Sequence, residues 1–520
     1  MQIQLTRRAA ADASSYPPSG SPGWLSLLAA IAAGLALAAA FPPVGIWPLA
    51  MAGPALLTLA VWGKGRLVTV GLALTTSTVF FVLLLTWLVN VAWYAWVALV
   101  ALEAGLFTVA ALALRPLLRL RAWPVAVAGW WVAEEALRDR FPYGGVPWGR
   151  LAMSQPGAPT AGWAAIGGPP LVTFVVALAG SCLAYLVLTR RRAFAAVAAV
   201  LALGLALTGD LVWRWTPAPG PTAIVAAVQG NVPHSRSLPK QLRETTVTAN
   251  HASATMAFAT AVRAGRRPAP DVVIWPENST DIDPALSPPT YATIASAVAA
   301  IDRPVLVGAV LQNPLRNTGE LWLPGRGPVQ VYVKRDLVPF GEVIPFRGLI
   351  DTFSSLPALQ PVNFTPGNRA VVFAVGKVRL GDVIWWEVGF DRLVLSEVQA
   401  GANLLTVQTN DADFELDGQL GETYQQLAMA RMDAITTGRE VVVVSTTGVS
   451  AFVAPDGSIT AATRTWQRSV LDRRVPLESA LTPADRVGSW PELAIVALTA
   501  LAVLYSVVAG RRSADGAVSA

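Results

Sequence analysis

The chain has 520 residues, of which 53% are hydrophobic and only 14% are charged, and its mean hydropathy is +0.49. Soluble domains carry roughly 25% charged residues, so this composition excludes a purely soluble protein and also a disordered one. A single cysteine, Cys182, and two histidines, His234 and His251, exclude an intrachain disulfide and leave little for a zinc centre. We therefore expect a membrane protein without a metal or another cofactor.

Apolar runs long enough to cross about 30 Å of hydrocarbon recur before residue 215, and one more lies near the C-terminus. They predict eight transmembrane spans. The fifth, Trp123–Leu137, is the weakest because it is short and contains Glu134 and Glu135. The other spans are expected at Trp24–Phe41, Ile46–Trp62, Val68–Leu88, Val91–Leu114, Ala164–Leu188, Ala193–Trp213 and Leu493–Ala509.

The distribution of lysine and arginine predicts the orientation, because cytoplasmic loops are enriched in these residues. If the N-terminus is cytoplasmic, seven crossings place the long polar segment outside the cytoplasm and the eighth returns the C-terminus to it. The connection 138–163 departs from this pattern. The basic net charge is then explained by membrane topology and not by binding of nucleic acid. The cytoplasmic segments hold Arg7, Arg8, Lys64, Arg66, Arg115, Arg119, Arg121, Arg190, Arg191, Arg192, Arg511 and Arg512.

Five segments follow from this organisation. Residues 1–23 are predicted to be a disordered cytoplasmic N-terminus, 24–214 a seven-span membrane domain and 215–489 a soluble domain. Residues 490–510 are the final transmembrane helix and 511–520 a disordered cytoplasmic tail. In the soluble segment, nine short β-branched runs alternate with helical stretches near Lys240–Arg263, Pro289–Ile301 and Glu422–Thr437, which predicts an α/β domain with stacked sheets.

Charged residues at the ends of apolar strands are the candidate functional residues of this domain. Glu277 follows the run Val272–Trp275, Lys334 ends another run, and Trp385, Trp386 and Glu387 end a third. α/β folds bind ligands at the carboxyl ends of strands. Taken singly, each has an ordinary structural interpretation: a capping or paired glutamate, a solvated lysine, and a sheet core.

Taken together, these motifs in this order resemble the apolipoprotein N-acyltransferases, integral membrane members of the nitrilase superfamily. The resemblance implies an eight-span helical bundle that carries an extracytoplasmic nitrilase-like αββα sandwich, the carbon-nitrogen hydrolase domain, in a bacterial inner membrane. It covers about residues 24–510. It rests on Trp131, Glu135, Arg138, Pro147-Trp148, Leu151–Gln155, Gln229–Pro233, Trp275-Pro276-Glu277, Leu337–Glu342, Thr409-Asn410-Asp411, Gly438-Arg439 and Thr447–Ala451.

The implied reaction is a ping-pong acyl transfer from a phospholipid donor to the N-terminal amine of a diacylglyceryl-cysteine lipoprotein. A cysteine thiolate first forms a thioester, so that one difficult step is split into two easier ones. By resemblance, Glu277 is the general base and Lys334 stabilises the oxyanion. Glu342, Glu387 and Trp386 fall on positions that support the site.

The nucleophile of this family is missing. Its position is Trp385, and Cys182 lies in a span, away from this domain. An indole N–H is only a donor, so Trp385 cannot form an acyl-enzyme, and its bulk should fill space that an acyl chain needs. The nearest hydroxyl in sequence is Ser396, and Arg335 stands where a histidine is common in the family.

Three functional hypotheses remain open at this point. The first is a homologue whose acyl transfer is deficient, a pseudoenzyme. The second is a non-catalytic membrane anchor or partner of a glycosyltransferase, the polyprenyl-phosphate mannose synthase that associates with family members in some high-GC bacteria. The third is direct acyl transfer without a thioester, in which Glu277 deprotonates the lipoprotein amine.

Overall fold

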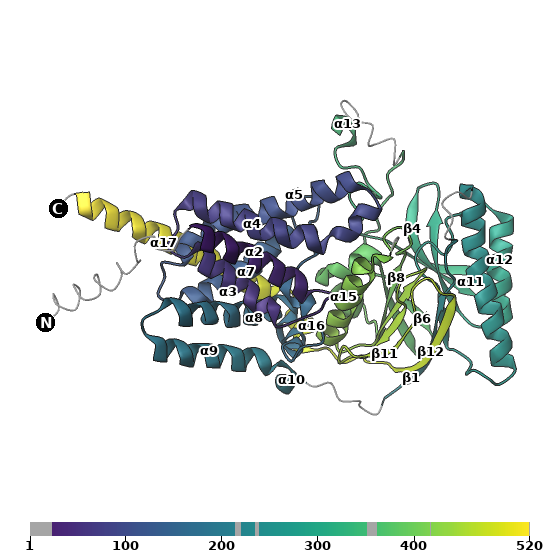
Figure 1. Cartoon of the computed structure of the whole chain (residues 1–520). Coiled ribbons are helices and arrows are strands. Elements are labelled where there is room, and N and C mark those ends of the chain that lie inside the picture. Colours follow the sequence, from purple (N-terminus) through teal and green to yellow (C-terminus); the bar gives the residue numbers. More distant parts are fainter. Residues whose placement is uncertain (1–22, 214–219, 234–238, 351–360, 416–417, 519–520) are drawn as a thin grey trace.

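The computed structural model describes residues 23–213, 220–233, 239–350, 361–415 and 418–518. A bundle of helices occupies one end of the molecule and a two-sheet domain the other (Figure 1). Arg7, Arg8 and His234 lie outside the described residues, as does nearly all of the N-terminal segment expected to be disordered.

Helices lie at all eight places where spans are predicted. Five stretches are long and apolar enough to cross a membrane by themselves: 23–40, 66–84, 93–117, 161–188 and 490–510. Two further apolar helices are shorter, and the fifth helix contains charged residues, as its sequence indicates. The main helices are α2 (Gly23–Ala40), α3 (Leu49–Val61), α4 (Arg66–Leu84), α5 (Trp93–Ala110), α7 (Trp123–Arg138), α8 (Ala164–Leu188), α9 (Arg192–Leu207) and α17 (Trp490–Val518), with short α6 (Leu114–Leu117) and α10 (Gly209–Val212).

Small residues let the bundle helices approach closely. A Cβ added at Gly34 of α2 would lie 2.6 Å from the carbonyl oxygen of Thr76 in α4. One at Gly180 of α8 would lie 2.2 Å from that of Met51 in α3. Helices in lipid associate through such van der Waals contact, because lipid tails are as apolar as the side chains.

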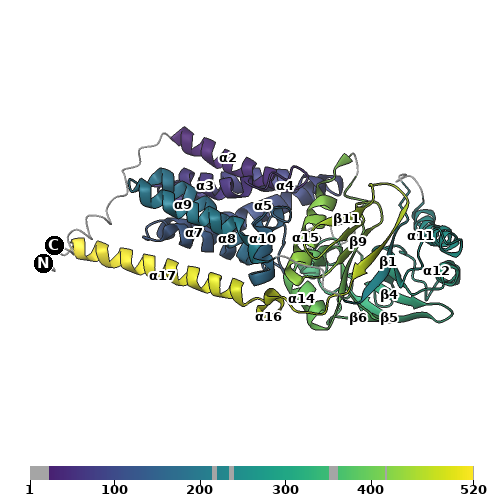
Figure 2. The same ribbon diagram turned by 90° about the horizontal axis from the view of Figure 1, so that it is seen from below.

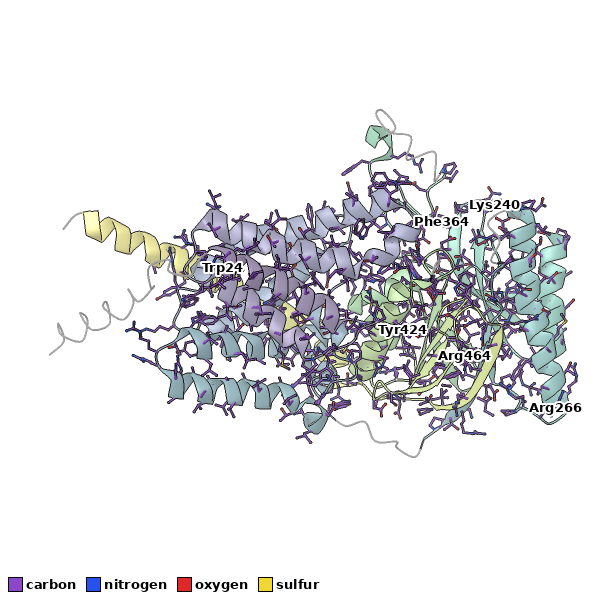
Figure 3. All side chains as sticks on the ribbon, in the orientation of Figure 1. Trp24, Lys240, Arg266, Phe364, Tyr424 and Arg464 are labelled. Carbon is purple, nitrogen blue, oxygen red and sulfur yellow. The ribbon has the colours of Figure 1, made fainter. Side chains whose placement is uncertain are left out.

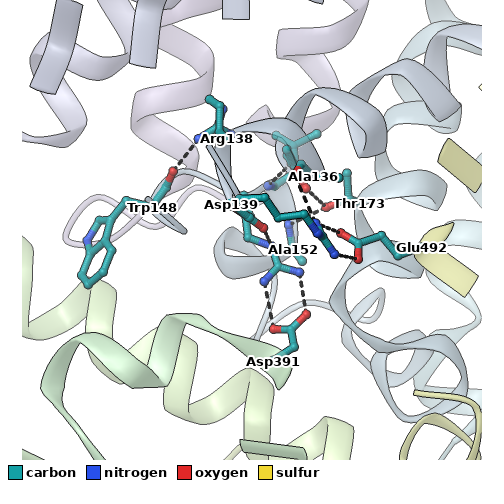
Figure 4. A network of polar contacts seen from close by, with 12 residues as sticks. Ala136, Arg138, Asp139, Trp148, Ala152, Thr173, Asp391 and Glu492 are labelled. Atoms are coloured by element: carbon teal, nitrogen blue, oxygen red, sulfur yellow. Dashed lines mark hydrogen bonds and ion pairs between the residues drawn. The ribbon is translucent and has the colours of Figure 1, made fainter. Parts of the chain in front are cut away.

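Charged residues inside the bundle are paired. Arg138 donates to Glu103 at 3.0 Å and to Glu134 at 2.5 Å. It also donates to the carbonyl oxygen of Trp148 at 2.8 Å (Figure 4). Intramembrane charges are costly and usually pair with one another or with carbonyls. Glu103, in the middle of α5, therefore has a structural partner in Arg138.

The soluble domain contains two six-stranded sheets. One has the strand order β12-β1-β2-β3-β4-β5 and the other β11-β10-β9-β8-β7-β6. In both, the central strands are parallel and buried, which explains their continuous apolar runs. The strands are β1 (Thr222–Gln229), β2 (Val272–Ile274), β3 (Val305–Leu311), β4 (Arg316–Leu323), β5 (Gly327–Val333), β6 (Val372–Val375), β7 (Val378–Ile384), β8 (Leu404–Thr409), β9 (Val441–Ser445), β10 (Ala451–Val453), β11 (Ile459–Ala462) and β12 (Ser469–Pro476).

Helices cover the outer face of each sheet. α11 (Lys240–Arg263) and α12 (Pro288–Ile301) lie on the far side, whereas α14 (Asp391–Gln399) and α15 (Gly421–Thr437) lie between the sheets and the bundle (Figures 1 and 2). Short α13 (Arg347–Ile350) and α16 (Pro483–Val487) complete the domain. The result is a layered αββα sandwich, with Trp24 in the bundle and Arg266 at the opposite end of the molecule (Figure 3).

Sequence patterns predicted nine strands and three helices of this domain, and elements lie at all of them. β4, β11 and β12 were not predicted, because their sequences are polar or mixed rather than uniformly β-branched. α14 was not predicted either, because it is amphipathic but only nine residues long, shorter than the segments in which periodicity identifies a helix. The apolar stretch that could cross a membrane ends at residue 510, as predicted. The prediction of a disordered tail from residue 511 was wrong up to Val518, because α17 continues to that residue.

Polar contacts join the bundle to the sheet domain. Trp87 donates its indole N–H to Gln425 of α15 at 3.1 Å, and Asn90 donates to the carbonyl oxygen of Phe414 at 2.8 Å. Arg150 forms a two-point ion pair with Asp391, at 2.9 and 2.7 Å (Figure 4). The site at the ends of the strands therefore lies beside residues that belong to the membrane bundle.

Candidate active site

Glu277 lies just beyond the carboxyl end of β2, a short strand with parallel neighbours on both sides. The chain runs through Trp275 and Pro276, and the Glu277 side chain is buried. A Cβ at Gly308 of β3 would lie 2.1 Å from the carbonyl oxygen of Pro276, so only glycine lets the turn pack there. This close packing fixes the carboxylate at the edge of the sheet.

Lys334, at the end of β5, lies between two carboxylates. Its Nζ donates to Glu277 Oε1 and to Glu342 Oε1, at 3.1 Å each. Asn317 of β4 bridges the same two oxygens, at 2.7 and 2.9 Å. The backbone N–H of Val338 holds the second oxygen of Glu342 at 2.9 Å. The structure thus brings together three residues that lie in separate parts of the sequence, and adds Asn317.

Burial and charge act in opposite directions at this cluster. The pKa of Glu277 is raised to about 7 in total: burial raises it most, the Lys334 ammonium partly offsets this, and the Glu342 carboxylate adds to it. Burial alone would lower the pKa of Lys334, but the carboxylates of Glu277 and Glu342 outweigh it and raise that pKa above its ordinary value. A buried carboxylate that titrates near neutral pH beside a permanent cation is suited to accept and return a proton.

Glu387 links the end of β5 to the end of β7 through hydrogen bonds to the backbone. Its carboxylate accepts from the backbone N–H groups of Arg335, Asp336 and Ile384, at 2.7, 3.2 and 2.8 Å. The Tyr332 hydroxyl contacts both oxygens, at 2.9 and 2.8 Å. This residue therefore fixes the end of β5, and with it Lys334, against the end of β7.

Glu387→Gln should lower the free energy of unfolding by about 3 kcal/mol, because the amide nitrogen would face donors that it cannot satisfy. Thermal or denaturant unfolding of the full chain in detergent measures the change. The matched substitution Glu478→Gln, at a half-buried position remote from this cluster, should change stability by less than about 0.5 kcal/mol. Equal effects of the two substitutions would contradict the role of Glu387.

Trp385 occupies the sharp turn that follows β7. Its φ is +41°, in the left-handed region that bulky residues rarely adopt. Such conformations cluster at functional sites and persist only where the surrounding structure holds them. The strained turn at the predicted nucleophile position is therefore present, although its side chain is an indole.

The indole of Trp385 is closely packed and is only 6% exposed. It stacks on Phe414 with ring centroids 5.0 Å apart and an interplanar angle of 13°, and it lies beside Trp386 at 5.7 Å. The Nζ of Lys334 lies 5.6 Å from its ring centroid. Trp386 in turn stacks on Trp148 of the bundle at 5.0 Å. Aromatic side chains thus fill the space next to Lys334.

A buried acidic group anchors the far edge of the indole. The Nε1 of Trp385 donates to Glu422 Oε1 at 2.7 Å. Burial raises the pKa of Glu422 well above its ordinary value, and the neighbouring Asp411 carboxylate raises it further. Asp411 itself accepts from Thr409, Thr423 and Ser445. Trp385 is therefore both hydrogen-bonded and stacked.

Several of these partners could not be found from the sequence. Asn317 lies on the unpredicted strand β4, and Glu422 begins a helix whose periodicity marks packing, not chemistry. Ser396, the nearest hydroxyl in sequence, accepts from Arg335 at 2.7 Å in α14 and is engaged away from the turn. Cys182 is buried in α8 against Ala199 and Ala202 of α9. The strand-end pattern selected Glu277, Lys334 and the segment that contains Trp385, and the resemblance to the family supplied their expected roles.

Comparison with known proteins assigns the two parts of the chain. Residues 33–182 match the apolipoprotein N-acyltransferase N-terminal domain and residues 224–481 match the carbon-nitrogen hydrolase family. Among solved structures, Saccharomyces cerevisiae Nit3, described as a member of branch 10 of the nitrilase superfamily, is similar with a TM-score of 0.35 and 14% identity, over 52% of this chain and 94% of that one. The chain is thus a membrane protein with a nitrilase-like domain.

Two curated relatives extend the assignment over nearly the whole chain. The apolipoprotein N-acyltransferase of Mycolicibacterium smegmatis is 37% identical over 516 residues, covering 92% of this chain and 84% of the relative. That of Azotobacter vinelandii is 31% identical over 525 residues, covering 93% and 94%. This protein belongs to the apolipoprotein N-acyltransferase family.

Proposed function

We propose that this protein is an apolipoprotein N-acyltransferase homologue that retains the scaffold and the acid–base pair of the site but lacks acyl transfer by the thioester route. The observation that carries the proposal is Trp385. Its indole occupies the turn where the nucleophile is expected, and it is held by Glu422 and stacked on Phe414. An indole N–H offers no lone pair for attack on an ester.

The remaining residues keep the roles that the family implies. Glu277 would take a proton from the attacking group and return it to the leaving alcohol, and Lys334 would stabilise the oxyanion on the ester carbonyl. In the reaction of the family, the acyl donor would be a phospholipid and the acceptor the amine of a diacylglyceryl lipoprotein. Glu342, Glu387 and Trp386 support the geometry. Among the described residues, the side chains at the turn include no thiol or hydroxyl that could replace the nucleophile.

The membrane arrangement is part of the proposal. Eight spans, with both termini in the cytoplasm of a bacterial cell, would place the nitrilase-like domain outside the inner membrane. The domain limits are those predicted: 1–23, 24–214, 215–489, 490–510 and 511–520. Helices at all eight predicted places and basic residues in alternate connections support this topology.

The direct test is a mass spectrum of a lipoprotein N-terminal peptide from a bacterial host that is depleted of its own N-acyltransferase and expresses the unaltered chain. We expect only the diacylated peptide. A triacylated peptide at wild-type abundance would overturn the proposal and favour direct transfer by Glu277, which Glu277→Gln would then abolish.

The pH dependence of any activity should follow Glu277. In a chain whose Trp385 is replaced by cysteine, the base works only when it is deprotonated, so the rate should rise about tenfold per pH unit below pH 7 and level off above it. Acyl transfer to a synthetic diacylated peptide, measured from pH 5 to 9, gives the profile. A flat profile through pH 7 would exclude Glu277 as the base.

The hypothesis of a non-catalytic membrane anchor predicts results that differ from those expected for a silenced acyltransferase. A non-catalytic partner of a membrane glycosyltransferase would remain inactive after the cysteine is restored, and it would co-purify with that enzyme from native membranes. Recovery of no glycosyltransferase would exclude it.

A further inference from the structure

A cavity of about 120 Å³ lies where the bundle meets the sheet domain, apart from the Glu277–Lys334 cluster. The end of α7, the bend in α8, and α14, α15, α16 and the start of α17 surround it. The bend is built from Gly167 and Gly168, the latter with φ +74° and ψ 178°, followed by Pro169 and Pro170. A single water needs about 10–15 Å³ of such volume, so the cavity has room for several atoms of a ligand.

The charges that line the cavity do not balance. Five carboxylates and three guanidinium groups face it: Asp139, Asp391, Asp433, Asp485 and Glu492, with Arg140, Arg150 and Arg392. Most are paired among themselves. Arg150 contacts Asp391 and Asp139, Arg140 contacts Glu492 (Figure 4), and Arg439, behind the wall, donates to Asp485 at 3.0 Å.

Asp433 of α15 is the exception. Its side chain is 3% exposed, its Oδ2 has no hydrogen-bond partner among the described residues, and no ion pair to it occurs there. The Oδ1 of Asp485, also deeply buried, has none either. Burial raises the pKa of Asp433 well above its ordinary value, the carboxylate of Asp391 adds to this, and the guanidinium group of Arg150 only partly offsets it. Two buried acceptors that face one cavity require a donor, and a cation with several N–H groups satisfies both.

The position of the cavity indicates where that cation comes from. Phe141 and Tyr143, just after α7, are 58% and 49% exposed, and Trp490, at the start of α17, is 75% exposed. Exposed aromatic residues at the ends of membrane helices mark the level of the lipid headgroups. Arg140 and Arg392 line the same cavity with half-exposed guanidinium groups. Each already pairs with one carboxylate, Glu492 and Asp336 respectively, and the exposed part of each guanidinium group remains available to a phosphate.

We propose that this cavity binds the headgroup of a phospholipid with a primary ammonium, with the ammonium against Asp433 and Asp485 and the phosphate toward Arg140 and Arg392. The bound lipid would be held non-covalently at the junction of the two domains. This site differs from the one at Lys334, so its occupation requires no acyl transfer.

Native mass spectrometry of the full chain in non-ionic detergent tests the proposal. Equal amounts of dioleoyl phosphatidylethanolamine and dioleoyl phosphatidylglycerol are added, and the two lipid adducts are counted. We expect about tenfold more of the ethanolamine lipid, since hydrogen bonds to a charged group discriminate by at least that factor. Asp433→Asn should reduce the ratio to near one, whereas Asp433→Glu and the exposed control Asp302→Asn should preserve it.

Either of two lipid ratios would overturn the proposal, as would full displacement of the lipid by a soluble amine. One is a ratio near one for the unaltered chain, and the other is an unchanged ratio in a folded Asp433→Asn variant. If that variant does not fold, the proposal is still tested by the ratio of the two lipid adducts, measured for the unaltered chain and for Asp433→Glu. Soluble phosphoethanolamine at the lipid concentration should not displace the lipid, and full displacement would show that the site takes soluble amines instead. Because the measurement is of binding alone, its outcome is separate from that of the acyl-transfer assay.

Discussion

Trp385→Cys should give this chain the acyl transfer that we propose it lacks. In a host depleted of its own N-acyltransferase, we expect the variant to triacylate most of a reporter lipoprotein, at least about 100-fold above the unaltered chain. The thiol would stand at a turn that already has the strained φ of +41°, and the acid–base pair is assembled nearby. Loss of the indole would also open the space between Phe414 and Lys334. The N-terminal peptide mass reports the result.

The same background provides the control. Adding Glu277→Gln to Trp385→Cys should lower the rate by about 10²–10⁴-fold, the usual contribution of a general base. Trp385→Ser offers a poorer nucleophile and should restore little. If Trp385→Cys is folded and inserted but adds no acyl chain, the site has lost more than its nucleophile, and the anchor hypothesis takes precedence.

Removal of the arginine inside the bundle should cause the largest loss of stability. Arg138→Ala leaves Glu103 and Glu134 buried without their cation and frees the carbonyl oxygen of Trp148. Breaking a buried ion pair on one side costs about 3–5 kcal/mol. Thermal unfolding of the purified chain in detergent should show a correspondingly lower midpoint.

Arg121→Ala is the matched control, because Arg121 is exposed in the connection between α6 and α7. It should leave the midpoint within a degree or two. A triple variant in which Arg138, Glu103 and Glu134 are all replaced by apolar residues should recover much of the stability lost in Arg138→Ala, because it leaves no buried charge. If the triple variant is destabilised as much as Arg138→Ala, the unpaired buried charges are not the cause of the lost stability.

Much of the fold could be predicted from the sequence because buried strands and helices have recognisable apolar patterns. The parallel strands β2, β3, β8 and β9 are buried on both faces and read as continuous apolar runs. β4 is different. Its residues Asn317, Gly319 and Glu320 are buried but polar or small, and they are buried because they serve the site and the packing of the two sheets.

The candidate site was partly predictable for a related reason. Glu277, Lys334 and Trp385 follow apolar strands, so their positions in the fold could be inferred from sequence. Glu422 could not be found this way, because it reaches the site from the next layer, through a hydrogen bond to Trp385. Contacts between layers depend on how the helices pack on the sheets, and they cannot be inferred from a local sequence pattern.

The single buried cysteine has a practical consequence for mapping the membrane topology. Cys182 is packed between α8 and α9, out of reach of a water-soluble maleimide while the chain is folded. A cysteine introduced at an exposed position would therefore be the one reactive thiol among the described residues, with no need to remove a native one first. Labelling of Lys240→Cys in intact cells, set beside Lys64→Cys, would show on which side of the membrane each segment lies.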